Sequence, residues 1–295
     1  MDTRRLELLV ALSRLGSMRA VADEMHVTTS TVSQQLAVLA TECGARLIEP
    51  DGRRVRLTPA GHRLADHAVT ILAAVEAARL SLDPAAEPAG TLRVAGFTTA
   101  IRRTLLPVLT TLARDHPKVT LLVHEHEPHE SLALLAADDI DLALVYDYNL
   151  VPARLDRTVL TIPLWTVPWS LGVPVDTVSV PTDNSVAVVD RFADIPWIVN
   201  SRNNVDETVV RILASMAGFE PEVTHRADSV ELLQDLIVAG LGVGLLPTDQ
   251  EVRPGVRLVP LTGPDVLMRG SAVIRRGRAD WPPLALVLDL LGRVV

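Results

Sequence analysis

The sequence contains a single cysteine, Cys43, among its 295 residues. One thiol excludes an internal disulfide and is typical of a protein from a reducing cytoplasm. A long hydrophobic run is also missing, because the longest uncharged segment, residues 158–175, carries Pro163, Pro168 and Pro174 and cannot form a regular membrane helix. Near the N-terminus, Glu7 interrupts the only apolar run that could resemble a signal peptide. We therefore expect a soluble cytoplasmic protein with no membrane association.

Positive charge is scarce, since 28 Lys and Arg stand against 36 Asp and Glu and the net charge is -8. This excludes a protein that coats nucleic acid through bulk charge. Residues 1–90 hold 10 basic and 11 acidic groups, a net charge of -1, which leaves -8 - (-1) = -7 for residues 91–295. Within the first part, a local group of arginines faces only Glu49 and Asp51: Arg46, Arg53, Arg54, Arg56 and Arg63. A small basic patch is therefore predicted inside an acidic protein.

Residues 3–44 have the periodicity of three short helices. Ser17 is a plausible N-cap of the second helix, and Thr28 or Thr29 of the third, which Gly44 closes. Residues 45–58 follow as a β-hairpin with its turn at Asp51–Gly52. Three helices and a hairpin form a winged helix-turn-helix, which places its third helix in the DNA major groove.

A long helix is predicted from Pro59, with Thr58 as its cap. Apolar or small residues repeat along it with 3-4 spacing, at positions 61, 64, 68, 71, 75, 78 and 82. This spacing is that of a coiled-coil seam and favours a linker helix that dimerises, although an amphipathic helix packed on its own domain would show a similar pattern. Residues 83–90, DPAAEPAG, then form a hinge.

Strand and helix patterns alternate from residue 91 onward, which predicts an α/β domain with largely parallel strands. The expected strands are 92–97, 119–127, 141–146, 197–201 and 242–247, and the expected helices are about 100–114, 129–138, 206–217, 229–240 and 282–292. The proline-rich segment 160–175 lies midway, where the chain could cross between two lobes.

The third helix begins with small polar side chains, which suit contacts to phosphates, thymine methyl groups and base edges. The candidate DNA-binding residues are Thr28, Thr29, Ser30, Thr31, Ser33 and Gln34 on this helix and Arg53 and Arg54 on the wing. A three-helix module alone is weak evidence, since many such bundles bind only protein. The arginines on the wing strengthen the prediction of DNA binding.

At this point the sequence resembles the LysR-type transcriptional regulators, and the resemblance covers essentially the whole chain. Residues 16–50, GSMRAVADEMHVTTSTVSQQLAVLATECGARLIEP, match the family's helix-turn-helix signature without a gap. Further matches are VRLTPAG (55–61), DIDLALVY (139–146), MAGFEPEV (216–223) and VAGLGVGLLP (238–247), in the expected order. Thr29 stands where the family often has a base-contacting glutamine, and Pro50 where it often has an arginine. Fewer phosphate contacts predict modest affinity per module and reliance on avidity.

The resemblance implies three parts: a DNA-binding domain (1–58), a linker with its hinge (59–90), and an effector-binding domain (91–295) like periplasmic binding proteins. In that domain, lobe I would comprise about 91–162 and 266–295, and lobe II about 163–265. A ligand would bind between the lobes, where helix N-termini favour anions. The candidate effector-binding residues are Thr98, Thr99, Tyr146, Asn200, Ser201, Arg202 and Arg226. For the Ser, Thr and Asn residues, ordinary helix capping is an equally good interpretation, and Arg226 could be a surface arginine.

The segment HEHEPHE, residues 124–130, could instead indicate a metalloenzyme. On a strand His124 and His126 face opposite to Glu125 and Glu127, so the whole set cannot converge on one ion. A site of His124, His126 and His129 would need the turn to fold back. A polar strand end leading into a helix N-terminus is the commoner explanation, and no H-E-x-x-H spacing is present.

We therefore expect a LysR-type, effector-controlled transcriptional regulator, not an enzyme, with no metal or other cofactor. Its expected partners are double-stranded promoter DNA, a small anionic or zwitterionic effector, a second copy of itself in a homodimer or homotetramer, and RNA polymerase. The alternative is a small-molecule or metal-binding enzyme or binding protein whose N-terminal helices serve only assembly.

Overall fold

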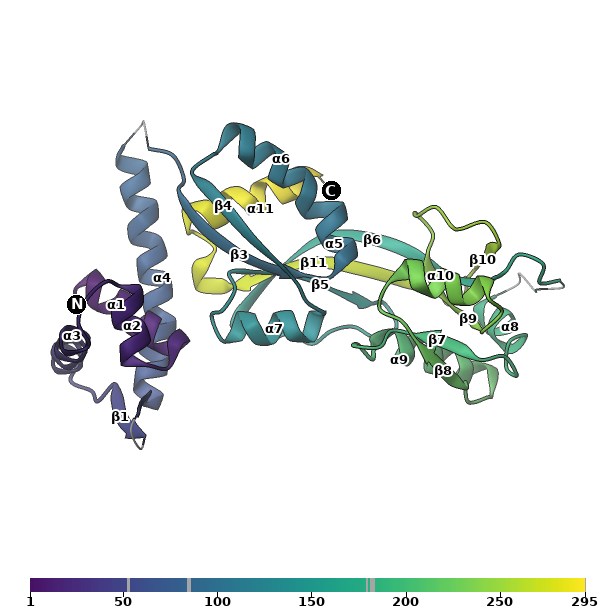
Figure 1. The fold of residues 1–295 in the computed structure, drawn as a ribbon, viewed down its shortest axis with the longest axis horizontal. Helices are drawn as coiled ribbons and strands as arrows, with labels where there is room; N and C mark the ends of the chain where they lie inside the picture. Colours follow the sequence, from purple (N-terminus) through teal and green to yellow (C-terminus); the bar gives the residue numbers. More distant parts are fainter. Residues whose placement is uncertain (52–53, 84–85, 179, 181–183, 295) are drawn as a thin grey trace.

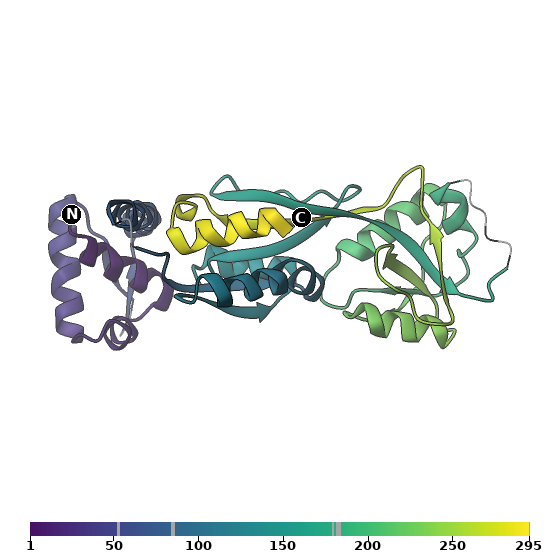
Figure 2. The same cartoon turned by 90° about the horizontal axis from the view of Figure 1, so that it is seen from above.

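The computed structural model describes residues 1–51, 54–83, 86–178, 180 and 184–294. An N-terminal module lies at one end, the long helix α4 stands beside it, and two α/β lobes follow in a row (Figure 1). Figure 2, seen from above, shows the same elongated sequence of module, helix and lobes. None of the described helices is long and apolar enough to cross a membrane.

The N-terminal module is built as the periodicity predicts. Its helices are α1 (Thr3–Leu15), α2 (Met18–Glu24) and α3 (Thr29–Cys43), and its hairpin is β1 (Ile48–Asp51) with β2 (Arg54–Leu57). Ser17 caps α2 by accepting from the backbone N–H of Ala20, and Gly44 ends α3 with a positive φ of 62°. The core side chains Leu9, Val32, Leu36 and Leu39 are fully buried. Gly52, in the predicted hairpin turn, lies outside the described residues.

Helix α4 (Pro59–Leu82) packs along α1 and also reaches the first lobe. The predicted seam does not all face outward, because Gly61 and Ala68 are buried within the chain. Leu82, at the far end of the seam, is 84% exposed. The first half of the repeat thus reflects packing on the chain's own module, and only its second half remains available to a partner.

The first lobe has three parallel strands at its centre, with β3 between β4 and β5. The strands are β3 (Gly90–Gly96), β4 (Val119–Glu125), β5 (Leu142–Tyr148) and the antiparallel β11 (Leu267–Arg275). The helical segments are α5 (Thr98–Ala100), a π-helical turn (Ile101–Leu105), α6 (Leu106–Asp115), α7 (Pro128–Ala136) and α11 (Pro282–Val294). A 3-10 turn, Arg276–Arg278, follows β11 and contacts α4.

The second lobe repeats the parallel arrangement, with β7 between β8 and β9. Its strands are β7 (Trp197–Val199), β8 (Val223–Arg226), β9 (Val243–Pro247) and β10 (Val256–Pro260). Its helices are α8 (Ser185–Asp190), α9 (Val205–Ala217) and α10 (Val230–Val238). The two-lobed α/β fold with an N-terminal winged helix-turn-helix is confirmed, although the patterns did not predict β8, β10, β11 or α8 as separate elements.

Strand β6 (Val159–Pro174) crosses from one lobe to the other. Its first part pairs with β11, and residues 169–174 pair with β9 and β10 of the second lobe. Proline lacks the N–H that a central strand needs, so it is tolerated at bulges and strand ends. Pro163 adjoins the register shift opposite Gly270 and Ser271, Pro168 lies where the partner strand changes, and Pro174 ends the strand.

Candidate functional site

The polar side chains predicted to read DNA stand at the start of α3, which lies at the outer edge of the N-terminal module (Figure 1). Thr29, Ser30, Ser33 and Gln34 are exposed, whereas Thr31 is half-buried. The buried side of the same helix, Val32, Leu36 and Leu39, fixes which face is presented to solvent. The sequence-predicted helix therefore offers an exposed row of hydroxyl and amide groups suited to a DNA groove.

Thr28 has a structural role that competes with DNA contact. Its side chain is the N-cap of α3 and accepts from the backbone N–H of Thr31 at 3.1 Å. The same hydroxyl lies 2.8 Å from the hydroxyl of Ser30. Thr28 thus orients the first turn of the helix, and Thr29 and Gln34 are the better candidates for direct contacts.

Of the two predicted wing arginines, Arg53 lies outside the described residues, and for Arg54 only the backbone of β2 is described. Their predicted contacts stay predictions. On the same hairpin, Arg56 is exposed and forms an ion pair of 2.8 Å with Glu49, so its charge is partly neutralised.

A small cavity lies where the two lobes meet, with a volume of about 60 Å³. Four of the predicted effector-binding residues line it: Thr98, Thr99, Tyr146 and Asn200. Effector pockets usually measure about 300 Å³ or more, so this one holds only a few non-hydrogen atoms unless the lobes separate. A neighbouring hollow of about 320 Å³ shares Thr98 and Thr99 and reaches Arg102 and Arg103, which extends the space outward.

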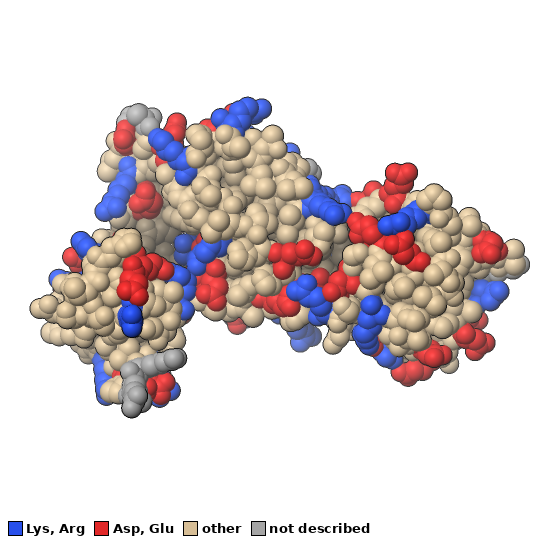
Figure 3. All heavy atoms as spheres, in the orientation of Figure 1, with Lys and Arg blue, Asp and Glu red and all other residues tan. Residues whose placement is uncertain are grey.

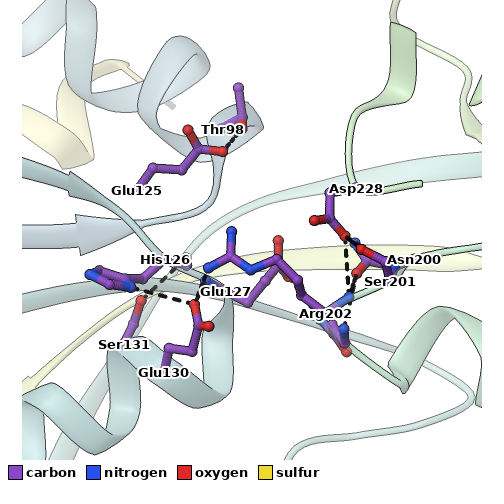
Figure 4. A network of polar contacts seen from close by, with 11 residues as sticks. Thr98, Glu125, His126, Glu127, Glu130, Ser131, Asn200, Ser201, Arg202 and Asp228 are labelled. Carbon is purple, nitrogen blue, oxygen red and sulfur yellow. Dashed lines mark hydrogen bonds and ion pairs between the residues drawn. The ribbon is translucent and has the colours of Figure 1, made fainter. Parts of the chain in front are cut away.

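The other three predicted residues, Ser201, Arg202 and Arg226, do not line this cavity. Arg202 pairs with Glu130 of the first lobe, and Ser201 donates to Asp228 (Figure 4). Arg226 forms an ion pair of 2.8 Å with Glu207. The loop before α9 therefore shapes the site through Asn200. The charges of Arg202 in that loop and of Arg226 at the end of β8 are used in ion pairs beside the cavity.

Acidic side chains that sequence reasoning did not select line the same cavity: Glu127, Asp206 and Asp228. Glu127 is the N-cap residue of α7 and is only 7% exposed. Its Oε2 accepts from the side chain of Asn203 at 3.1 Å, and that amide also donates to the Tyr146 hydroxyl at 2.7 Å. Two helix N-termini, one from each lobe, thus bring acidic groups together.

Burial raises the pKa of the carboxyl groups of Glu127 and Asp206. For Glu127 the Asn203 hydrogen bond opposes this effect without cancelling it. For Asp206 burial raises the pKa to about 7, and the nearby Glu127 charge adds to the rise while Tyr148 and Tyr146 oppose it. Among the described residues, Asp206 Oδ1 is buried without a hydrogen-bond partner in good geometry, and so is the Tyr148 hydroxyl that faces Asp206.

The HEHEPHE segment is divided between several local contacts. Glu125 accepts from Thr98 at 2.5 Å, and His126 lies 3.4 Å from Glu130 (Figure 4). The rings of His124 and His126 are stacked on one face, with centroids 6.3 Å apart. Across the described residues, which include this whole segment, no group of three His, Cys, Asp or Glu side chains could hold a metal ion. Within the segment, Glu127 is the residue that lines the cavity.

Among the described residues, three ion pairs join the lobes around the cavity: Arg202–Glu130, Arg102–Glu231 at 2.9 Å, and Arg103–Asp249. Arg103 also lies over the ring of Trp165, 5.1 Å from its centroid. Blue and red side chains gather at this junction on the face shown in Figure 3. Each exposed pair contributes little alone, about 0–1 kcal/mol, but together they favour the arrangement of the two lobes seen in this structure.

Two family models match the chain. Residues 3–62 match the model described as "Bacterial regulatory helix-turn-helix protein, lysR family", and residues 85–295 match "LysR substrate binding domain". The hydrogen peroxide-inducible genes activator of Dickeya chrysanthemi is 29% identical over 285 residues, covering 94% of this chain and 90% of that protein. The transcriptional dual regulator GltC of Bacillus subtilis is 28% identical, with 93% of each chain covered.

Solved structures show the same fold over the full length. A full-length OxyR variant from Pseudomonas aeruginosa has a TM-score of 0.70 at 20% identity, covering 100% of this chain and 94% of that one. Full-length CbnR complexed with its target DNA has a TM-score of 0.53 at 22% identity, covering 100% and 99%.

Proposed function

The chain belongs to the LysR family of bacterial transcriptional regulators, and from this premise we propose that α3 and the wing bind promoter DNA under the control of a small molecule held between the lobes. The observation that carries the proposal is the pairing of an exposed polar helix start at Thr29–Gln34 with an interlobe cavity in one chain. The enzyme alternative is not favoured, because the relatives are regulators.

The proposed division of the chain is that made from the sequence: residues 1–58 for DNA, 59–90 as linker, and 91–295 for the effector. The proposed direct contacts are Thr29, Ser30, Ser33, Gln34 and the wing arginines. Thr28 and Thr31 support the helix start. A regulator that binds promoter DNA acts in the cytoplasm, and we propose RNA polymerase as a further partner at the promoter.

We propose self-association through the second half of α4. Val75 is half-buried, and Ala78 and Leu82 are exposed along one side of the helix. A second copy that covered these residues would form a homodimer with two DNA-binding modules, and pairing of dimers would give a homotetramer. Two linked modules compensate for modest affinity of each module.

The proposed control is a shift between lobe arrangements. A ligand that binds the closed form of the two lobes better than the open form stabilises the closed form. Closure then changes the relative positions of the DNA-binding modules that are linked to the lobes. The three interlobe ion pairs support such a two-state element, since they exist only while the lobes meet. The effector-binding part contains no cysteine, so thiol oxidation is not its signal.

The test is retention of sheared genomic DNA from the source organism by the full-length protein, followed by sequencing of what is retained. The wild type should retain a few sites with half-sites about one or two helical turns apart. The Thr29→Ala, Gln34→Ala variant should lose at least about tenfold in affinity for them, because base-edge contacts are worth about 1–3 kcal/mol each.

The matched control is Thr110→Ala with Gln250→Ala, which removes the same two side-chain types from exposed positions of the effector-binding part. It should retain the same sites as the wild type. A featureless background that is identical for wild type and both variants would overturn the DNA-binding proposal.

A further inference from the structure

The cavity between the lobes has an unusual charge for a site expected to bind an anion. Its acidic lining residues are Glu127, Asp206 and Asp228, and no Lys, Arg or His is among the described residues that line it. Two arginines beside the cavity, Arg202 and Arg226, are held in ion pairs with Glu130 and Glu207. An anion placed here would face acidic groups without a cation of its own.

Unpartnered polar groups at the cavity point independently to a ligand. Trp169 lines it and is 7% exposed, and its indole N–H has no hydrogen-bond partner within the described part of the chain. Asp206 Oδ1, also at the lining, is a buried acceptor without a partner. Buried polar groups are rarely left unpaired, because each one costs about as much as a lost hydrogen bond. The Tyr148 hydroxyl, which is also buried and unpartnered, faces Asp206 and interacts with it. The Trp169 indole N–H therefore remains as the donor for which a ligand would supply the acceptor.

The arrangement of supporting residues fixes the acidic groups in place. Glu127 and Glu130 form a capping box at the start of α7, so the Glu127 backbone and side chain are both held. Asn203 links Glu127 of the first lobe to Tyr146 and belongs to the second lobe. Closure of the lobes therefore brings Glu127 and Asp206 to the same small space.

We propose that the effector carries a cationic nitrogen, a primary ammonium group, which binds between Glu127 and Asp206, with an oxygen acceptor of the same molecule facing the Trp169 indole N–H. This inference rests on the proposed function, since it assigns a chemical class to the effector of that site. It differs from the sequence-based expectation of an anionic or zwitterionic effector, because helix N-termini favour anions only where acidic side chains do not occupy them. A zwitterion remains compatible, since its acidic end could extend toward Arg102 and Arg103 in the outer hollow.

The experiment uses three probes of the same size and shape in an amine-free buffer: ethanolammonium chloride, neutral ethylene glycol and sodium glycolate. Binding to the full-length protein is measured by saturation-transfer NMR on the probe methylene protons and by the shift of the thermal unfolding midpoint, with sodium chloride as the ionic baseline. With so few atoms the probe should bind in the millimolar range. We expect ethanolammonium to bind and the other two probes to show no saturable binding.

The variants Glu127→Gln and Asp206→Asn keep the side-chain shape and remove one negative charge each. Both should weaken ethanolammonium binding by at least about tenfold, because a buried charge-assisted hydrogen bond is lost. The matched control is Glu220→Gln, which removes one negative charge from an exposed position in the lobe that contains Asp206. Glu220 forms an ion pair with Arg211, away from the cavity lining, so the variant should change ethanolammonium binding less than about twofold. Thermal unfolding of each variant without probe confirms that it is folded.

Glycolate binding in preference to ethanolammonium would overturn the assignment, as would absence of binding by all three probes or an effect equal to that of sodium chloride. These failures are distinct from failure of the proposed function. If the protein retains specific DNA sites but binds glycolate, only the assignment of the ligand class is refuted. If it binds ethanolammonium but retains no DNA sites, only the proposed DNA-binding function is refuted.

Discussion

Replacing Gly61 by alanine is expected to lower the free energy of unfolding of the N-terminal module by about 3 kcal/mol, the upper range for overpacking. A Cβ at this position would lie 2.1 Å from the carbonyl oxygen of Leu47 and 3.2 Å from the Leu57 Cβ. The Leu47 carbonyl cannot retreat easily, because it accepts the backbone N–H of Thr58 at 2.9 Å. The first turn of α4 would have to move away from the hairpin.

The consequence for function follows from the same contact. Thr58 caps α4 and donates to the Arg46 carbonyl at 2.6 Å, so this corner joins the linker helix to the wing. A displaced corner should weaken DNA retention as well as stability. Both are measured on the full-length protein, the first by binding to a retained site and the second by thermal unfolding.

The matched control is Gly292→Ala in α11, where a Cβ would meet nothing within 4 Å. There the change should be neutral or stabilise by up to about 1 kcal/mol, since alanine is the better helix former. Equal stability of Gly61→Ala and the wild type would show that the close approach of α4 to Leu47 is not needed.

Asp206→Asn is expected to stabilise the ligand-free protein by about 2 kcal/mol at pH 8 and by little at pH 4. The folded-state pKa of Asp206 is about 7, raised by burial above the value of about 3.9 for an unfolded chain. A carboxyl group whose pKa is raised on folding stabilises the folded state fully at a pH below its pKa in the unfolded chain. This stabilisation is lost as the pH rises through its pKa in the folded protein. The wild type should therefore lose stability relative to the variant between pH 4 and 7. The stabilisation is smaller than the full linkage value because the Asp206 side chain keeps partial contact with solvent.

The affinity for ethanolammonium should rise with pH, whereas the stability of the ligand-free wild type falls. An ammonium group needs an ionised Asp206, so ethanolammonium should bind more tightly at pH 8 than at pH 5.5 in the wild type, about tenfold or more. The titratable groups that face Asp206 are Glu127 at the start of α7 and the hydroxyls of Tyr148 and Tyr146 in β5. Unfolding and probe titrations at each pH measure both trends. A stability difference between wild type and variant that does not change with pH would show that Asp206 does not titrate near neutrality.

Much of the fold followed from local patterns. Helix periodicity and the caps at Ser17, Thr28 and Thr58 predicted α2, α3 and α4, because capping and burial of one helix face are decided within a few residues. The strands of the parallel sheets, apart from β8, followed in the same way. Strand β6 was recognised only as a crossing segment, since its prolines are tolerated through a bulge and a change of partner that lie in other strands.

The sequence by itself determined the family, the order of the parts, and four of the residues around the cavity: Thr98, Thr99, Tyr146 and Asn200. Only the tertiary structure decided the charge of that cavity. Glu127 and Asp206 are 79 positions apart and each looks like an ordinary acidic residue at a helix start. The raised pKa of both carboxyl groups arises because the two lobes meet and remove water from them. Gly61 is a second example. Its position in the 3-4 repeat could be predicted from the sequence, but its contact with Leu47 could not, because that contact depends on how α4 packs against the hairpin.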